Sequence, residues 1–304
     1  MTASYDLTTG DGRFRIYKLN AAWKRDRLVE VRDAANVLLA RTRFAADDDV
    51  LDIGGLPEDR PCVVRIRHGN ALKRLLAPKE TLRATPAPRR LRALISGSGR
   101  CGTVSTSHYL DGLRYRDGTV CMARHETLWE YILPPLAAGD HEAVGAFMRG
   151  FTHHIEAAPH FALAPGLIEA DTVVHLIRDG RRVVQSGLNK GWYSKDSLWN
   201  AIKPDFTGDA FEKSCRFWAH ANRNMAGVAQ LTVRLEDLAA SPRALADLVS
   251  ALDLEPTDRP FPLANTGKQA STFGHWTPQE HETFARTCGD LMDHFYPDWR
   301  QAPK

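Results

Sequence analysis

The feature of this chain that most limits how it can fold is a glycine-rich loop that directly follows a short apolar run. Residues 91–95 have the composition of a buried strand, residues 96–102 include three glycines, and a helix is expected over residues 103–113. A strand that turns sharply into a helix points several backbone N–H groups and the positive end of the helix at one place. The loop therefore predicts an anion site within an α/β fold.

The second half of the sequence repeats this alternation of strand and helix. Residues 172–177 are an apolar strand pattern, residues 178–180 a turn and residues 181–188 a helix, and a further strand is expected at residues 231–235. Such alternation is typical of a parallel sheet with helices packed on it. We therefore expect an α/β domain with a parallel sheet flanked by helices, and the spacing of Gly97 and Gly102 in the loop is that of a P-loop-type sheet.

Two later helices are predicted from their first residues. Ser241-Pro242 has an N-cap residue followed by proline at the first helical position, and residues 277–280 form a capping box. The last helix should bury four side chains that recur at helical spacing. These are Phe284, Cys288, Leu291 and Phe295.

The N-terminal third of the chain has a different pattern. Short strand-like stretches occur at residues 14–19 and 63–67, and three prolines interrupt residues 77–90. We expect a small β-rich module over residues 1–88 and a second domain over residues 89–304. Residues 1–90 hold 18 Lys and Arg against 12 Asp and Glu, so the module carries a basic excess.

Composition and charge argue against several classes of protein. The formal net charge of +3 is too small to indicate a nucleic-acid partner. The first thirty residues are too charged for a signal peptide, and no run of eighteen apolar residues occurs, so we expect a cytoplasmic protein without a membrane span. No metal site or disulfide framework is expected, because the cysteines are odd in number and widely spaced. They are Cys62, Cys101, Cys121, Cys215 and Cys288.

The glycine loop by itself is compatible with several kinds of site. Read as G-x-G-x-x-G, residues 97–102 match the fingerprint of an NAD-dependent dehydrogenase, with Asp117 at the distance expected of the ribose-binding acid. Read as G-x-x-x-x-G, they have the spacing of a nucleotide-dependent kinase, although the Lys-Ser/Thr pair that should follow is missing. A tight turn without a ligand is a further interpretation. Arg100, inside the loop, adds a cation to the anion site.

Residues 96–103, Ser-Gly-Ser-Gly-Arg-Cys-Gly-Thr, resemble the 5′-phosphosulfate loop of the sulfotransferases that use 3′-phosphoadenosine 5′-phosphosulfate (PAPS). The similarity is to members with arginine in the loop, among the protein-tyrosine, carbohydrate and bacterial enzymes, rather than to the cytosolic enzymes, which have lysine. Cys101 and Val104 stand where serine and threonine are usual. The resemblance implies that the 5′ end of PAPS is bound by Gly99, Arg100, Cys101, Gly102, Thr103 and Ser105.

A second basic motif lies after the strand at residues 172–177. Arg178 comes directly after this strand and Ser186 follows eight residues later. At this spacing a guanidinium and a hydroxyl can converge on one phosphate. The alternative interpretation is a solvated basic turn. The segment resembles the 3′-phosphate motif of the same family. The resemblance covers residues 91–297 and implies that Arg178 and Ser186 bind the 3′-phosphate, with Lys190 and Lys268 adding charge. Two well-separated anion pockets are thus expected.

The resemblance also implies the reaction and its base. Glu126 stands where protein-tyrosine and trehalose sulfotransferases have a catalytic glutamate, and His125 is the alternative base because the cytosolic enzymes use histidine. PAPS would be the sulfuryl donor and 3′,5′-adenosine bisphosphate (PAP) the product, with no metal required. The acceptor would be a small molecule or glycan with a hydroxyl or amine. Trp192, Tyr193 and Trp199 are candidates for the floor of its pocket, or for ordinary core packing.

Overall fold

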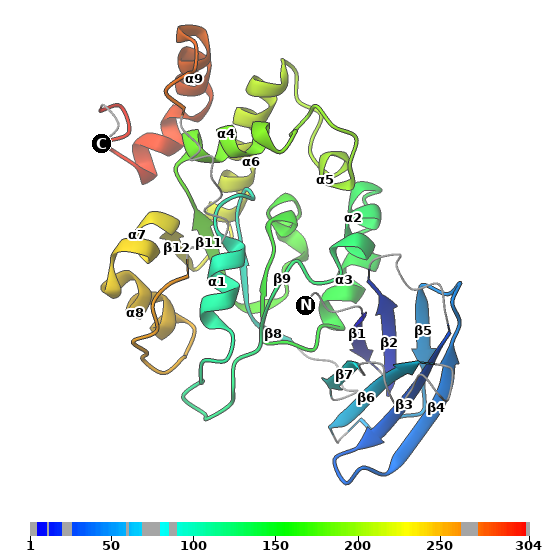
Figure 1. Cartoon of the computed structure of the whole chain (residues 1–304). Helices are drawn as coiled ribbons and strands as arrows, with labels where there is room; N and C mark the ends of the chain where they lie inside the picture. The colour runs from blue at the N-terminus through cyan, green and yellow to red at the C-terminus, as the bar shows by residue number, and fades with distance from the viewer. Residues whose placement is uncertain are drawn as a thin grey trace. The chain divides into compact units, whose positions relative to one another are not determined.

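The computed structural model describes residues 5–10, 12–19, 26–58, 61–68, 80–84, 90–262 and 273–301. The chain divides into two compact units (Figure 1). The N-terminal unit is Met1–Arg90 with Glu142–Thr152, and the C-terminal unit is Leu91–His141 with His153–Lys304. Glu142–Thr152 therefore belongs to the first unit, although it lies well past the boundary expected near residue 88.

The N-terminal unit is a β-sandwich of two antiparallel sheets. One sheet has the order β1-β2-β5 and the other the order β4-β3-β6-β7. The strands are β1 (Tyr5–Gly10), β2 (Arg13–Lys18), β3 (Arg27–Asp33), β4 (Leu38–Phe44), β5 (Val50–Ile53), β6 (Cys62–His68) and β7 (Glu80–Ala84). Phe14 and Ile16 of the first sheet pack in one apolar core with Val29 and Val64 of the second, as in sheets that pack face to face.

One helix from later in the chain completes this unit. It is α3 (His141–Arg149). The N–H of Thr9 on β1 donates to the carbonyl of Gly150 at 2.8 Å, and the rings of Tyr17 and Phe147 lie 5.6 Å apart. These contacts explain why the segment is part of the sandwich rather than of the domain that surrounds it in sequence.

The C-terminal unit contains a five-stranded, all-parallel sheet with the order β12-β11-β8-β10-β9. Its strands are β8 (Leu91–Ser96), β9 (Ala123–His125), β10 (Ile155–Ala157), β11 (Ala170–Ile177) and β12 (Leu231–Arg234). The expected α/β class is confirmed, as is the β-rich N-terminal module. The strand predicted at residues 172–177 begins two residues earlier, and its apolar side chains are buried on both sides of the sheet.

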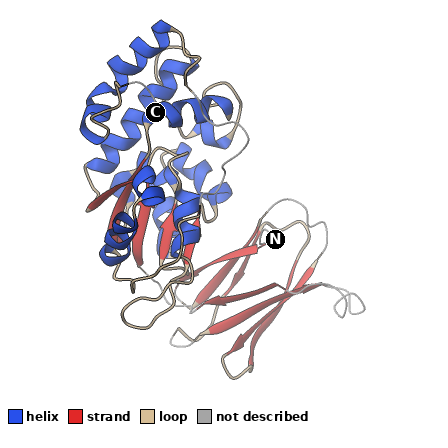
Figure 2. Ribbon diagram, turned by 60° about the vertical axis from the view of Figure 1, so that its left-hand side comes forward, coloured by secondary structure: helices blue, strands red, loops and turns tan. Residues whose placement is uncertain are grey.

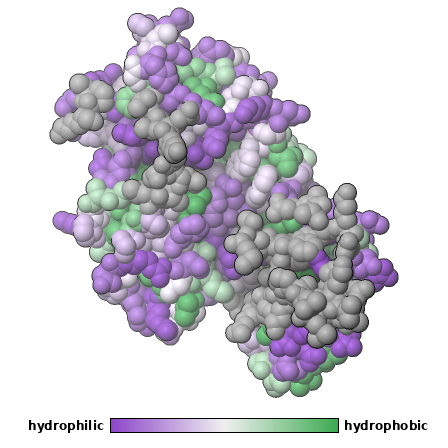
Figure 3. All heavy atoms as spheres, in the orientation of Figure 1, coloured by the Kyte–Doolittle hydropathy of each residue, from purple (hydrophilic) through white to green (hydrophobic). Residues whose placement is uncertain are grey.

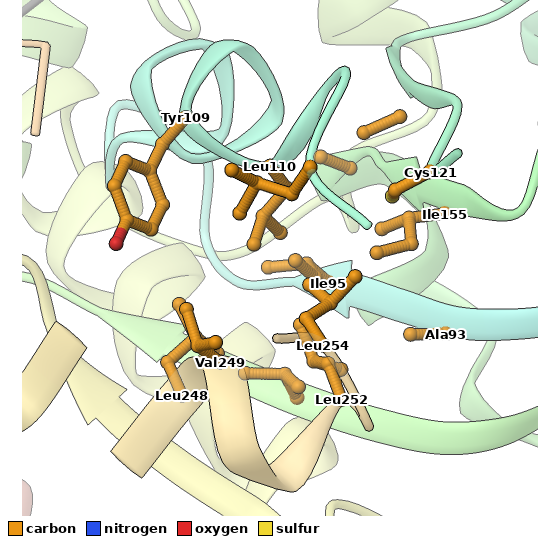
Figure 4. Packing of buried hydrophobic residues seen from close by; sticks show 14 of the residues in the cluster. Ala93, Ile95, Tyr109, Leu110, Cys121, Ile155, Leu248, Val249, Leu252 and Leu254 are labelled. Carbon is orange, nitrogen blue, oxygen red and sulfur yellow. The ribbon is translucent and has the colours of Figure 1, made fainter. Parts of the chain in front are cut away.

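Helices cover both faces of this sheet (Figure 2). They are α1 (Thr103–Leu110), α2 (Trp129–Ala137), α4 (Gly180–Asn189), α5 (Leu198–Ala201), α6 (Ala210–Ala226), α7 (Leu235–Ala240), α8 (Pro242–Ala251) and α9 (Pro278–Phe295), with short 3₁₀ turns at Pro159–Leu163 and Pro165–Leu167. Val174 of β11 joins the cluster of α1 and α8, whereas its neighbour Val173 packs with Met225 of α6. In Figure 4 the side chains of α1, β8 and α8 converge on that first cluster.

Most predicted helix ends agree with the structure. The Ser241 side chain caps α8, and Thr277 and Glu280 form the capping box of α9. The first helix ends at Leu110 rather than at residue 113, because Asp111 is already extended and Gly112 has a positive φ. In α9 the buried positions are Phe284, Cys288, Gly289 and Met292; Leu291 and Phe295 are only half-buried, which corrects that prediction.

Few large apolar side chains are exposed among the described residues; they are Val37, Leu38, Val50, Val120, Leu198 and Val228. In Figure 3 hydrophilic residues dominate the visible face, and apolar residues occur in small groups. Among the described helices, none combines the length and the apolar composition needed to cross a bilayer.

Candidate active site

A cavity of about 550 Å³ lies at the carboxyl ends of β8 and β11. These strands are neighbours in the sheet. After β8 the chain continues to β9 and β10, on one side of the pair, and after β11 it continues to β12, on the other side. In open α/β sheets ligands bind at such a reversal. The glycine loop follows β8 and Arg178 follows β11, so the loop and Arg178 line the same cavity, whereas Ser186 of the second motif is not among the lining residues and contacts Arg100 instead.

The shape of the loop depends on its glycines. A Cβ on Gly97 would lie 2.1 Å from the carbonyl oxygen of Leu176 on β11, and one on Gly102, where φ is 106°, would lie 2.4 Å from Leu235 Cδ1. Gly99 has φ 77°, a region that other residues adopt rarely. No acceptor in the described part of the chain receives the N–H groups of Arg100, Gly102 or Val104. The loop therefore offers backbone donors to an anion.

The two predicted anion motifs meet at Arg100. The guanidinium of Arg178 donates to the carbonyl of Arg100 at 3.0 Å, and Nε of Arg100 donates to the hydroxyl of Ser186 at 2.9 Å. The expected two well-separated pockets are thus a single connected basic region, because the adjacent strands β8 and β11 bring both motifs to one point. Burial lowers the pKa of Arg178, yet an arginine remains charged at neutral pH.

The remaining predicted binding residues lie in different places. Cys101 is fully buried in the core, and burial raises the pKa of its thiol to about 11, so only its backbone could reach a ligand. Thr103 and Ser105 line the cavity from the first turn of α1. Lys190 lines it from an exposed position after α4. Lys268 lies outside the described residues.

His125, the last residue of β9, and Glu126, which directly follows it, also line the cavity. Nε2 of His125 lies 3.0 Å from the Thr103 hydroxyl and 3.5 Å from a carboxylate oxygen of Glu126. Burial lowers the pKa of His125 to about 4, so its imidazole is neutral at pH 7. Burial, with the nearby negative charge of Glu156, raises the pKa of Glu126 to about 7 in spite of Arg100. Glu126 can therefore exchange a proton near neutral pH.

Glu126 lies in a tight turn, not in the first turn of a helix. Its φ is 50° and that of Leu128 is 54°, and α2 begins only at Trp129. The fully buried carboxylate of Glu156, on β10, accepts hydrogen bonds from Thr127 and contacts Nε2 of His153 at 2.7 Å. This anchor holds the turn, and with it Glu126, against the sheet.

His160 is a cavity residue that the sequence did not indicate. It is 1% exposed, lies in the 3₁₀ turn after β10 and lines the cavity. Neither ring nitrogen has a hydrogen-bond partner among the described residues, and burial lowers the pKa of the ring to about 4. Both nitrogens are themselves buried, so this neutral imidazole can donate to or accept from a ligand only after its ring or a neighbouring side chain moves. In the sequence it is only one histidine among twelve.

Aromatic side chains form another wall of the cavity. Trp192 and Trp199 line it, and Trp199 stacks on Trp129 with ring centroids 6.2 Å apart. Tyr193 donates its hydroxyl to the carbonyl of Pro204 instead. Burial lowers the pKa of Lys203 to about 8, and its ammonium donates to the carbonyl of Trp199 at 2.6 Å. Phe211, Cys215 and Trp218, by contrast, belong to the core.

The dinucleotide interpretation of the loop lacks its acidic partner. Asp117 forms an ion pair of 2.9 Å with Arg92, which lies near the start of β8, whereas the glycine loop follows the end of that strand. In addition β9, the next strand along the chain, lies at the edge of the sheet and not beside β8. Dinucleotide-binding sheets place the second strand next to the first.

No family model and no curated protein matches this chain. Among solved structures, the FN5 domain of Drosophila Lar is 9% identical, with a TM-score of 0.23 over 28% of this chain and 92% of that one. The apo β-glucuronidase of Ruminococcus gnavus is 10% identical, with a TM-score of 0.26 over 76% of this chain and 53% of that one. This chain thus spans about half the length of the glucuronidase, and likenesses with such TM-scores support no conclusion about activity.

Proposed function

We propose that this chain is a PAPS-dependent sulfotransferase that transfers a sulfuryl group to a hydroxyl or amine of an acceptor. One observation carries the proposal: a carboxylate with a pKa of about 7, Glu126, shares a cavity with a basic glycine loop and with Arg178. Transfer of a charged group between oxygens needs cations for the leaving group and a base for the attacking group. The cavity brings both together.

The residues present fit the donor. The loop N–H groups, Arg100 and Thr103 would hold the 5′-phosphosulfate, and Arg178, Ser186 and Lys190 the 3′-phosphate. The volume of about 550 Å³ lies within the range of small-molecule sites. When bound, PAPS supplies the sulfuryl group and a leaving phosphate.

The protein's own groups would act on the proton and on the developing charge. Glu126 takes the proton of the acceptor hydroxyl as the new S–O bond forms. Arg100 and the loop N–H groups stabilise the negative charge that grows on the phosphate oxygen as the old S–O bond breaks. Neutral His125 shares a hydrogen bond with the Thr103 hydroxyl through Nε2, and this nitrogen lies 3.5 Å from the Glu126 carboxylate.

Label transfer tests the proposal. The full chain is incubated with ³⁵S-labelled PAPS and a panel of glycans, phenols and amines. We expect label in at least one acceptor class, and a loss of about 10²- to 10⁴-fold in Glu126→Gln, the usual contribution of a general base. PAP should bind this variant as tightly as it binds the wild type.

Other outcomes would identify other activities. Magnesium-dependent turnover of ATP without label transfer would indicate a kinase, and binding of NAD in place of PAP a dehydrogenase. PAP binding without transfer to any acceptor would indicate an anion-binding module. Each of these results would overturn the proposal.

A further inference from the structure

One face of the four-stranded sheet in the N-terminal unit is rich in arginine. Val29, Val31, Val64 and Ile66 enter the core of the sandwich, so the alternate residues of these strands face outward. The charged residues among them form what we call the arginine face: Glu30, Arg32, Arg41, Arg43, Arg65 and Arg67.

The strand register places these side chains on a regular grid. Arg41 of β4 and Arg65 of β6 lie on either side of Glu30, and Arg43 and Arg67 lie on either side of Leu28. Neighbouring strands are about 4.8 Å apart and alternate residues along a strand about 6.8 Å apart. The arginines therefore cover an area of sheet, and do not form a single line.

A single buried carboxylate organises three of the arginines. Glu30 is 4% exposed, and its Oε1 accepts from Nε and Nη2 of Arg41 at 3.1 and 2.6 Å. Arg32 and Arg67 approach its Oε2 at 3.6 and 3.9 Å. Burial alone would raise the pKa of Glu30, but these arginines hold it below its usual value, so the carboxylate stays ionised. It orients the guanidinium groups and neutralises only one charge.

The face keeps a positive surplus. Asp26 pairs with Arg43, and Glu30 is the other carboxylate in contact with these side chains, so two acids oppose five arginines among the described residues. Arg65 makes no ion pair with another described residue. The side chains of Arg41 and Arg43 are 55% and 73% exposed. Their remaining N–H groups are available to an anion from solution.

We propose that the arginine face binds a linear polysaccharide that carries carboxylate or sulfate groups. A guanidinium binds the oxygens of such groups in pairs, and Glu30 orients that of Arg41 through Nε and Nη2, which leaves the N–H groups of its Nη1 for a ligand. Charges spread over a flat sheet suit a ligand whose anionic groups repeat along successive rings. The surface belongs to the N-terminal unit and its test needs no turnover, so it stands apart from the proposed transfer reaction.

Other polyanions fit the face less well. Single-stranded nucleic acids are held largely by stacking of bases on aromatic side chains, and no aromatic residue is among the outward residues described on β3, β4 and β6. An anionic membrane attracts any cluster of basic residues and requires no ordered forks. Both are included in the test.

Binding of the full chain to immobilised heparin and to polygalacturonate tests the proposal, with neutral dextran, oligo-dT and phosphatidylserine vesicles as further probes. The double variant Arg41→Gln with Arg65→Gln is compared with Arg13→Gln with Arg15→Gln, which removes the same charge from the other sheet of the same unit. The single variant Arg65→Gln covers the case in which loss of Arg41 unfolds the sandwich.

We expect the Arg41/Arg65 variant to bind the two charged polysaccharides about tenfold more weakly, with a shallower dependence on salt, and the Arg13/Arg15 variant to bind within about twofold of wild type. Arg65→Gln should give a smaller loss in the same direction. Equal losses in the two double variants would overturn the proposal, since they would show an effect of net charge alone. Tighter binding of oligo-dT or of vesicles than of either polysaccharide would overturn it as well.

Discussion

The carboxylate of Glu156 accepts two hydrogen bonds from Thr127, from its N–H at 3.0 Å and from its hydroxyl at 2.6 Å. Thr127 follows Glu126 directly, so a buried negative charge on β10 both anchors the turn and acts on the carboxylate that we propose as the base. This relationship joins the stability of the turn to the chemistry of the cavity.

Replacing Glu156 should therefore change the pH dependence of transfer. The charged groups that act on Glu126 are Glu156, which raises its pKa, and Arg100, which lowers it. A base works in its deprotonated form, so the acid limb of kcat/KM should lie near pH 7 in the wild type. In Glu156→Gln the pKa of Glu126 should fall, and the limb should move to lower pH.

The control for that experiment is Glu130→Gln, which removes a charge from the first turn of α2. Its pH profile should match the wild type. Titration of ¹³C-labelled glutamate by NMR, assigned through Glu126→Gln, reports the same pKa without turnover. A folded Glu156→Gln protein with an unshifted Glu126 would contradict the assigned role of Glu156.

The raised pKa of Glu126 should also appear in stability. An exposed glutamate has a pKa near 4.3, whereas the pKa of Glu126 is about 7. Folding therefore takes up a proton at pH values between these two. The native state loses stability as pH rises through this window. Glu126→Gln has no such charge to bury. It should raise the free energy of unfolding on the order of 1–3 kcal/mol at pH 8 and little at pH 4.

Urea unfolding of both proteins at the two pH values checks this expectation. If the difference between the variant and the wild type were the same at pH 4 and pH 8, Glu126 would not be the titrating group. The test is independent of any activity.

Gly97→Ala should disrupt the loop. The new Cβ would meet the backbone of β11 at Leu176, which cannot move away without shifting a central strand. We expect a loss of about 1–3 kcal/mol, typical of overpacking, together with a loss of PAP binding. Gly166→Ala is the matched control, because nothing lies within 4 Å of its Cβ. Thermal unfolding and PAP titration measure both effects, and equal behaviour of the two variants would contradict the close packing.

His160→Phe separates a binding role from a packing role. The phenyl ring fills a similar volume and removes two buried nitrogens that lack partners, so stability should stay the same or rise. Transfer to the acceptor should fall about tenfold or more, because the cavity loses its donor and acceptor. A drop in stability with unchanged kcat/KM would show that His160 only supports the fold.

Local patterns sufficed for much of the fold. The apolar runs that became β8 and β11 differ from the structure by at most two residues at either end, and the caps of α8 and α9 agree, because strand burial and capping depend on neighbouring residues. Contacts between residues that are far apart in the sequence could not be predicted from these local patterns. The docking of Glu142–Thr152 on the sandwich depends on partners more than a hundred residues away, such as Thr9.

The same division holds for the candidate site. From sequence alone come the glycine loop, Arg178 with Ser186, and the pair His125 and Glu126, since their spacing within short motifs is visible along the chain. Strand order decided that these motifs share one cavity. Burial depends on every neighbour in space, so only the tertiary structure decided it. Burial leaves His160 at this cavity without hydrogen-bond partners and directs the thiol of Cys101 into the core. It also raises the pKa of Glu126, which therefore holds its proton to near neutral pH.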